Sequence, residues 1–313
     1  MNKQTTSAQG KIAVLGVFVA DASYRASRQP VMGETVLGSE FSLGPGGKGS
    51  NQAVAAARCG AQVSMVTRLG ADEFANMALE LWGSEKITPC VEQLSESYTG
   101  SAYIFIDEKT GDNAIIICPG AAATISAAFV DQYSQPIKDA DIFLTQLEQP
   151  VDAAIRALQI AREANTRTIF NPAPAEPVDD SIFALCDYVT PNETETEAFT
   201  GMTVNTIDEA RAAADVLLKK GVGTAVITLG EQGVLLHSAA FSEHVPAFHA
   251  GPVVETTGAG DAFNGGFATA LAQGEHPLDA ARFGCAVAGL SVTRRGAAAS
   301  MPQLAEARAL LSS

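Results

Sequence analysis

Residues 42–70 read SLGPGGKGSNQAVAAARCGAQVSMVTRLG, which is a glycine-rich turn, a helical pattern and an apolar run in succession. The helical pattern covers Lys48–Cys59, and the apolar run Gln62–Gly70 is typical of a buried strand. A helix that leads directly into a buried strand is part of a βαβ unit. We therefore predict an α/β fold from this stretch.

The flanking sequence repeats the same alternation. Further short apolar runs occur at Lys11–Gly16, Asp141–Gln146, Arg167–Asn171, Asp187–Pro191 and Thr224–Gly230. Helical patterns occur between most of them, at Val151–Ala164 and Ile207–Gly221, and three more are expected from Gly258, around Leu278–Thr293 and near Pro302–Leu311. This order predicts a mostly parallel central β-sheet flanked by helices on both faces. In such sheets ligands bind beyond the carboxyl ends of the strands.

Two segments interrupt the alternation. Val31–Leu43 contains strand-like pieces without a helix, and Tyr98–Cys118 has the pattern of a hairpin around the polar turn 108–113. They predict a small β-sheet, from segments about 17–43 and 98–118, that is either a lid over the site or a dimerisation surface. We expect one α/β domain over residues 11–313, preceded by a disordered tail at residues 1–10.

Charge and composition exclude several classes of protein. The chain has 20 Lys and Arg against 35 Asp and Glu, a formal net charge of −15, which disfavours sequence-independent binding to nucleic acid or anionic lipid. The polar N-terminus lacks the apolar region of a signal peptide, and no run approaches the roughly 20 apolar residues that cross a bilayer. The five cysteines are scattered without a CxxC pair, which favours reduced thiols in the cytoplasm over a zinc site or disulfides.

The glycine-rich turn admits more than one interpretation. Gly44, Gly46 and Gly49 satisfy the dinucleotide-binding pattern GxGxxG, and Asp72 would then be a candidate ribose ligand. Two features argue against this interpretation: the turn does not follow the first strand, and Pro45 removes one backbone N–H group that would bind phosphate. A close backbone approach, with polar side chains on the first helical turn, suits a polyhydroxy compound better. A helix start without any ligand is the third interpretation.

The segment Glu255–Phe263, ETTGAGDAF, has the composition of an anion-binding helix start. Consecutive backbone N–H groups at Gly258, Ala259 and Gly260, together with the helix dipole, favour a bound phosphate. Asp261 in the first turn could serve only as a capping carboxylate. Beside an anion site, however, a carboxylate can accept the proton of an attacking hydroxyl in phosphoryl transfer.

These two segments resemble the signatures of the ribokinase family of carbohydrate kinases, which also holds fructokinases and adenosine kinase. The N-terminal signature corresponds to GPGGKGSNQAVAAARCGAQV and the C-terminal one to ETTGAGDAFNGGF. Five landmarks agree in order: Asp21, QLE at 146–148, NPAPA at 171–175, PNETE at 191–195 and TLGEQG at 228–233. The resemblance covers Lys11 to Pro302 and implies a ribokinase-like α/β fold, with closest similarity to the ribokinases.

The resemblance implies ATP-dependent phosphorylation of the 5-hydroxyl of a pentose, with D-ribose favoured. Asp261 would be the catalytic base, and Gly258, Ala259 and Gly260 would form the anion hole. Sugar hydroxyls would contact Asp21, Gly47, Lys48, Asn51 and Glu148. Mg²⁺ and the phosphates would be organised by Asn192 and Glu195, and the nucleotide loop by Thr228, Gly230 and Gly233. A K⁺-type cation would lie near Glu255, Thr257, Ser291, Arg294, Gly296 and Ser300, and the lid would pair two copies into a homodimer.

Two positions depart from the family pattern. Val19 stands where ribokinases typically carry Asn, as in 2-deoxyribose kinases of the family, and Glu255 replaces the usual Asp of the cation site. The alternatives are therefore a 2-deoxyribose kinase, another sugar or nucleoside kinase, or a non-catalytic sugar-binding regulator. Taken singly, the candidate residues also have structural explanations, such as Asn192 and Glu195 forming a helix-capping pair.

Overall fold

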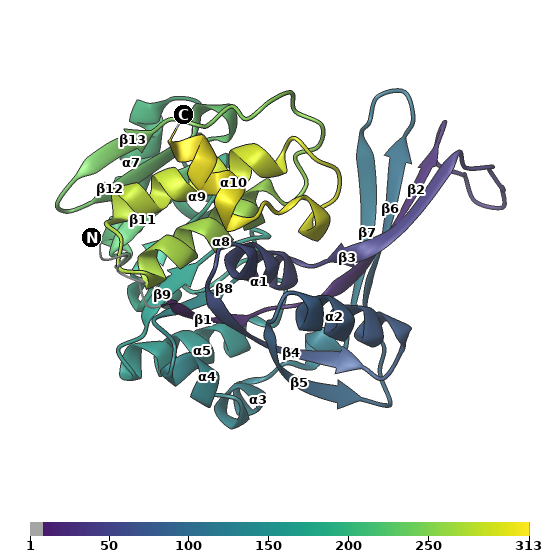
Figure 1. The fold of residues 1–313 in the computed structure, drawn as a ribbon, viewed down its shortest axis with the longest axis horizontal. Helices are drawn as coiled ribbons and strands as arrows, with labels where there is room; N and C mark the ends of the chain where they lie inside the picture. The colour runs from purple at the N-terminus through teal and green to yellow at the C-terminus, as the bar shows by residue number, and fades with distance from the viewer. Residues whose placement is uncertain (1–8, 313) are drawn as a thin grey trace, which may run out of the picture.

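The computed structural model describes residues 9–312 and contains a nine-stranded sheet and a separate four-stranded sheet (Figure 1). The large sheet has the order β13-β12-β11-β10-β9-β8-β1-β4-β5. Every pair from β11 to β5 is parallel, and β12 and β13 are added antiparallel at one edge. Its strands are β1 (Lys11–Leu15), β4 (Gln62–Gly70), β5 (Thr88–Leu94), β8 (Ile142–Thr145), β9 (Arg167–Phe170), β10 (Tyr188–Val189), β11 (Thr224–Thr228), β12 (Val234–Ser238) and β13 (Ser242–Val245).

Helices cover both faces of this sheet. The α-helices are α1 (Lys48–Arg58), α2 (Glu73–Ser84), α3 (Ala127–Gln132), α4 (Gln135–Lys138), α5 (Val151–Glu163), α6 (Glu193–Thr200), α7 (Ile207–Lys219), α8 (Ala259–Ala272), α9 (Pro277–Ser291) and α10 (Leu304–Leu311). Within residues 9–312, no helix combines the length and apolar character required to span a bilayer.

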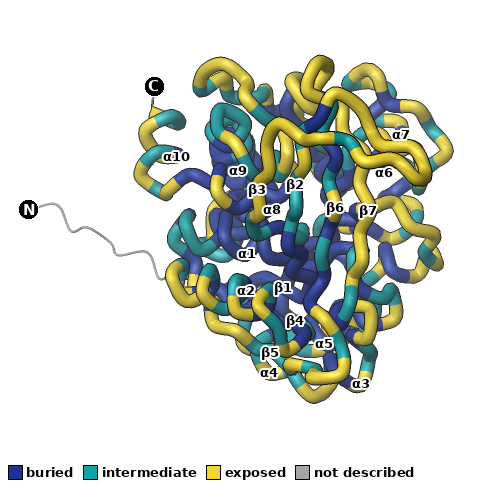
Figure 2. Tube along the Cα trace, turned by 90° about the vertical axis from the view of Figure 1, so that its right-hand side faces the viewer, coloured by how far each residue is buried: buried dark blue, intermediate teal, exposed yellow. Residues whose placement is uncertain are grey.

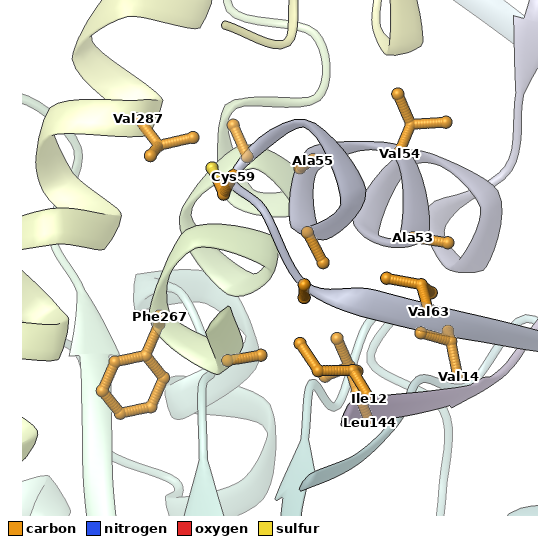
Figure 3. Packing of buried hydrophobic residues seen from close by; sticks show 14 of the residues in the cluster. Ile12, Val14, Ala53, Val54, Ala55, Cys59, Val63, Leu144, Phe267 and Val287 are labelled. Carbon is orange, nitrogen blue, oxygen red and sulfur yellow. The ribbon is translucent and has the colours of Figure 1, made fainter. Parts of the chain in front are cut away.

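The core forms two layers because side chains alternate along each buried strand. Ile12 and Val14 of β1 pack in the layer beneath α1, α2, α8 and α9, where Figure 3 shows them facing the α1 side chains. Ala13 and Leu15 pack in the opposite layer with α3, α5 and α7. Both faces of the central strands are therefore buried, which explains their continuous apolar runs.

The small sheet has the order β3-β2-β6-β7 and stands beside the main body (Figure 1). Its strands are β2 (Val19–Ala26), β3 (Glu40–Gly46), β6 (Thr99–Asp107) and β7 (Asn113–Gly120). Strand register places Asp21, Ala102 and Ile117 on one face, and Tyr24, Phe41, Tyr103 and Ile116 on the other. Strands β3 and β7 are largely exposed (Figure 2).

The predicted fold class and main alternation are confirmed, with corrections at several elements. Strands β5, β12 and β13 and helices α2, α3 and α4 were not predicted. Val31–Leu43 is mostly loop, because strand β3 begins only at Glu40 and then continues into the glycine-rich segment as far as Gly46. The expected tail at residues 1–8 lies outside the described residues. Gly10, assigned to that tail, is buried and accepts a hydrogen bond from the Gln62 N–H (2.9 Å), so it belongs to the folded body.

Candidate active site

Helix α8 begins at the carboxyl ends of the central strands and faces a cavity of about 170 Å³. Gly258 precedes the helix with φ 79°, and no side chain caps it. Within residues 9–312 the N–H groups of Gly258 and Gly260 have no hydrogen-bond partner, so both can bind an anion. Ala259 differs from the prediction, because its N–H donates to the Thr256 carbonyl (3.1 Å) and stabilises the turn instead.

Asp261 is buried where the starts of α1 and α8 meet. Its Oδ2 accepts a hydrogen bond from Asn51 Nδ2 (3.0 Å), and its Oδ1 accepts one from Gln52 Nε2 (2.9 Å). Burial raises the pKa of Asp261, while the positive charge of Lys48 and the two amide donors act in the opposite direction. The glycine-rich segment and the carboxylate predicted to act as base therefore share one site, although about 210 residues separate Asn51 from Asp261.

Two further carboxylates face Asp261 from the small sheet and from the end of β8. Glu148 Oε2 accepts a hydrogen bond from the Lys48 backbone N–H (2.7 Å), and burial raises the Glu148 pKa to about 7. Burial and the charge of Asp261 together raise the pKa of Asp21 to about 6. Burial lowers the Lys48 pKa, but the charges of Asp261, Glu148 and Glu195 outweigh it and keep the ammonium protonated. Lys48 is thus the cation at the centre of an acidic site.

The glycines beside these carboxylates are required by close packing. A Cβ on Gly46 would lie 2.0 Å from Asp21 Oδ2, so only glycine leaves room for that carboxylate. Gly47 has φ 86° and precedes α1, and a Cβ there would approach the Val17 carbonyl to 2.7 Å. The glycine-rich segment thus joins the small sheet to α1 with its backbone close to the site.

Asn192 and Glu195 line the cavity and also form the capping box of α6. The Asn192 N–H donates to Glu195 Oε2 (2.9 Å), and the Glu195 N–H donates to Asn192 Oδ1 (2.8 Å). The capping interpretation is therefore correct for this pair, and it does not prevent a role in the site. Burial raises the pKa of Glu195, whereas the Asn192 N–H and the positive charge of Lys48 act in the opposite direction.

The three predicted nucleotide-loop residues lie at the end of β11 and in the turn after it, with Thr228 as the last residue of the strand. Thr228 lines the cavity, and its N–H donates to the Pro191 carbonyl (2.9 Å). Gly230 (φ 51°) and Gly233 (φ 96°) shape the turn behind it. A Cβ on Gly233 would lie 2.1 Å from the Val245 carbonyl, so this turn packs directly on β13.

The residues predicted for a monovalent cation come from the loop before α8 and from the end of α9 with the segment that follows it. Glu255 Oε2 accepts a hydrogen bond from the Gly296 N–H (3.1 Å), and Thr257 is exposed. Other side chains of the set point to other partners: the Ser291 and Ser300 hydroxyls donate to the carbonyls of Ala288 and Ala297, and Arg294 pairs with Glu306. Among the described residues no group of three or more His, Cys, Asp and Glu side chains is arranged to bind a metal.

Sequence reasoning missed four polar residues that complete the site. Gln52 is in direct contact with Asp261, and Asn171, Thr190 and Asn264 line the cavity. Asn171 and Thr190 directly follow β9 and β10, a position that parallel-sheet topology marks as ligand-facing. Asn264 lies one helical turn after Gly260. The positions of Asn171, Thr190 and Asn264 could therefore have identified these three residues from the sequence, whereas no such signal marks Gln52.

A larger groove of about 680 Å³ lies at the opposite end of the sheet. It is lined by the first residues of β1, β4 and β5, namely Lys11, Gln62 and Thr88. None of the predicted site residues contributes to it. Because ligands of parallel sheets bind at the carboxyl ends of strands, the smaller cavity is the candidate active site.

Comparison with known proteins agrees with this geometry. The sequence profile of the pfkB family carbohydrate kinases matches residues 9–304. The chain belongs to the pfkB family of carbohydrate kinases. This pfkB kinase is 38% identical over 292 residues to a ribokinase of Haemophilus influenzae, covering 93% of the chain and 95% of the relative. It is 37% identical over 305 residues to a deoxyribokinase of Salmonella typhi, covering 96% and 98%.

The fold agrees with solved structures of the same family. A structure of Arabidopsis thaliana ribokinase complexed with ribose and ATP matches with a TM-score of 0.92 and 29% identity, covering 98% of this chain and all of that chain. The pfkB kinase is thus a sugar kinase with the ribokinase-like fold, and the dinucleotide interpretation of the glycine-rich segment is wrong. In the structure Gly44 and Gly46 belong to β3 of the small sheet, and Asp72 caps α2 by accepting from the Ala75 N–H (2.9 Å).

Proposed function

We propose that this pfkB kinase transfers the γ-phosphoryl group of ATP to the 5-hydroxyl of D-ribose. The similarity to the Haemophilus influenzae ribokinase and to the Arabidopsis thaliana structure with ribose and ATP supports both substrates. The observation that carries the proposal is the position of Asp261, one residue after the free Gly260 N–H and within hydrogen-bond distance of Asn51 and Gln52.

Asp261 is the proposed catalytic base. Its carboxylate takes the proton from the 5-hydroxyl, whose oxygen then bonds to the γ-phosphorus while the bond to the β–γ bridging oxygen breaks and ADP leaves. The N–H groups of Gly258 and Gly260 stabilise the charge on the transferring phosphoryl oxygens. The ammonium of Lys48, which lines the same cavity, adds positive charge where the phosphoryl group passes.

The sugar is proposed to lie between the small sheet and α1, against Asp21, Gly47, Lys48, Asn51 and Glu148. Asn51 supports this arrangement, since its Oδ1 is buried without a partner within residues 9–312 and can accept a hydrogen bond from a sugar hydroxyl. Carboxylates such as Asp21 and Glu148 accept bonds from paired hydroxyls. The small sheet then serves as a lid that excludes water from the phosphoryl group.

Magnesium and a monovalent cation are proposed as cofactors. Within residues 9–312 the other oxygen of the Glu195 carboxylate accepts no hydrogen bond, which suits Mg²⁺, and Asn192 holds that carboxylate in place. When bound, Mg²⁺ would neutralise phosphate charge. Thr228, Gly230 and Gly233 border the proposed nucleotide site. For K⁺, Glu255 supplies one carboxylate, and Thr257, Ser291, Arg294, Gly296 and Ser300 would contribute mainly backbone oxygens because several of their side chains are engaged elsewhere.

Assembly and location are proposed from the small sheet and the cysteines. The outer face of the small sheet exposes Tyr24, Phe41, Tyr103 and Ile116, which supports a homodimer formed through this face. All five cysteines are unpaired, which supports the reducing environment of the cytoplasm.

A preference for 2-deoxyribose is the second candidate function, and Val19 favours it. Val19 is buried and lies two residues before Asp21 on β2, so both side chains share the face toward the sugar. The valine side chain cannot form a hydrogen bond with a sugar hydroxyl, so this position does not favour ribose over 2-deoxyribose. The Salmonella typhi deoxyribokinase is as similar to this chain as several ribokinases.

The test combines a substrate survey with one substitution. ADP release is measured with ribose, 2-deoxyribose, fructose and adenosine, and the highest kcat/KM identifies the substrate. Asp261→Asn should lower kcat by about 10²–10⁴-fold, because it removes the proton acceptor, and leave ATP and sugar affinity nearly unchanged in calorimetry. Full turnover of Asp261→Asn would rule out the assigned base, and a higher kcat/KM for 2-deoxyribose would select the second candidate.

A further inference from the structure

Gln52 contacts the proposed base from a buried position that does not line the cavity. Its side chain is completely buried. Nε2 donates to Asp261 Oδ1 (2.9 Å) and to Asn171 Oδ1 (3.1 Å), while Oε1 accepts a hydrogen bond from Gln146 Nε2. Both N–H groups and the carbonyl are thereby occupied. These partners fix the orientation of the Gln52 amide. If its nitrogen and oxygen exchanged places, Oε1 would face the acceptor oxygens of Asp261 and Asn171.

The hydrogen bonds continue from Gln52 to the anion hole. Asn171 Nδ2 donates to the Thr190 carbonyl (2.9 Å), and the Thr190 hydroxyl donates to Asn264 Oδ1 (2.7 Å). Asn264 Nδ2 donates to the Gly260 carbonyl (2.9 Å). We call these four residues, Gln52, Asn171, Thr190 and Asn264, the polar ring. It begins at the Asp261 carboxylate and ends at the carbonyl of the preceding residue, so it fixes the base relative to the helix start.

We propose that Gln52 is a positioning residue for phosphoryl transfer, which holds the Asp261 carboxylate in a fixed direction toward the sugar hydroxyl. This inference rests on the proposed role of Asp261 as the base. Asn51 and Gln52 both donate to Asp261 in the structure, but their functions differ. Asn51 has an unpartnered oxygen for the sugar, whereas Gln52 has no free group and stays with Asp261 when the sugar binds.

The charges around Asp261 make the Gln52 donor important for its ionisation. Four charged groups face it, from α1, β2, the loop after β8, and α6 respectively: Lys48, Asp21, Glu148 and Glu195. Three of these are carboxylates, which disfavour the ionised base. The Gln52 hydrogen bond favours it. Loss of this bond therefore raises the pKa of Asp261, and a higher pH is then needed to ionise the base.

The deciding experiment measures kcat against pH, at saturating sugar and ATP, for the Gln52→Met variant. Methionine keeps the length of the side chain and removes its hydrogen bonds. We expect kcat to fall about 10- to 100-fold, and the acid limb of the profile to move upward by about one pH unit. KM for the sugar should stay within about threefold, because Gln52 does not touch it.

Gln149→Met is the matched control. Gln149 is also a buried glutamine, whose Nε2 donates to Thr145 Oγ1 (3.0 Å) and to the Gln146 carbonyl, but within residues 9–312 no hydrogen bond joins it to Asp261. It should lower the unfolding temperature comparably and leave the pH profile of kcat in place. A shift of the acid limb in Gln149→Met as large as in Gln52→Met would overturn the inference, because it would mark a general effect of core damage.

Two further variants keep the test decisive. If Gln52→Met does not fold, Gln52→Glu preserves the shape and should move the acid limb upward, since it brings a second carboxyl group to Asp261. Adding Gln52→Met to Asp261→Asn should cost little further activity, because the two residues act as one unit. If the acid limb and kcat of Gln52→Met both match those of the unmodified chain, the positioning role of Gln52 is refuted and the proposed function still stands. Full activity of Asp261→Asn would instead refute the proposed function.

Discussion

Gly46 shows how the absence of a single side chain makes room for a functional group. An alanine Cβ at this position would lie 2.0 Å from Asp21 Oδ2 and 2.5 Å from its Cγ. The short Asp21 side chain must then rotate away from the proposed sugar site. We expect Gly46→Ala to raise KM for the sugar by about one to two powers of ten through the lost hydrogen bonds. Steady-state kinetics measures this effect.

Gly44→Ala is the control for this substitution. Gly44 lies two residues earlier on β3, and a Cβ there meets no atom within 4 Å. Its sugar KM should match that of the unmodified chain. Equal KM values for both variants would mean that Asp21 does not bind the sugar.

The buried carboxyl group of Glu148 should make the stability of the folded chain depend on pH. Burial raises its pKa from 4.5 to about 7, so the folded chain binds the proton more tightly than the unfolded chain does. This contribution to the free energy of unfolding is complete below pH 4.5 and is lost as the pH rises through 7. Glu148→Gln is neutral at every pH. Its unfolding temperature, compared with that of the unmodified chain, should therefore become relatively higher between pH 5 and pH 8.

Thermal unfolding of the ligand-free protein at several pH values measures this difference. A constant difference across the range would show that Glu148 titrates normally in the folded chain.

At the scale of elements, the site depends on how closely α1 and α8 approach. A Cβ on Gly265 of α8 would lie 2.5 Å from the Ala55 Cβ and 2.8 Å from the Ala56 backbone N. Small residues at this crossing let Gln52 reach Asp261. Gly265→Ala should lower the free energy of unfolding by about 1–3 kcal/mol through overpacking, and should lower kcat as the helices separate. Urea unfolding with activity assays tests both effects.

Gly83 provides the opposite case on α2. A Cβ there meets no atom within 4 Å, and its φ is not positive. Gly83→Ala should therefore raise the free energy of unfolding by about 0.5–1 kcal/mol through helix propensity and leave kcat unchanged. If both glycine variants stabilise the chain equally, the α1–α8 contact is looser than described.

The elements also show what sequence patterns can and cannot determine. Central strands such as β1 and β8 are buried on both faces, so their apolar runs identify them. The edge strands β5 (TPCVEQL) and β13 (SEHV) are largely half-buried or exposed, and they carry too few apolar residues for that signal. The contact between Gln52 and Asp261 spans 209 residues and exists only because two helix starts meet. The family signature could identify Asp261 as the candidate base, whereas the contact of Gln52 with Asp261 becomes apparent only from the fold.

At the scale of the whole molecule, the small sheet has two faces with different roles. One face carries Asp21 toward the site. The other carries an aromatic group in which the Tyr24 ring lies 5.0 Å from the Phe41 ring and 5.5 Å from the Tyr103 ring. Strand β7 pairs with β6 and forms one edge of the small sheet, and Ile116 on the aromatic face is 63% exposed. An exposed apolar face with an open edge is typical of an association surface.

We therefore expect Ile116→Lys to convert the proposed dimer into a monomer, because a charge in a desolvated apolar interface is costly. Sedimentation velocity over a range of protein concentrations measures the change. Met32→Lys is the control, since Met32 is fully exposed on the loop between β2 and β3, and it should leave the dimer intact. Ile116 faces away from Asp21, so monomeric Ile116→Lys should keep its proposed sugar contacts and lose activity only if dimerisation holds the lid in place. A monomeric unmodified chain would refute the interface and leave the catalytic assignments untouched.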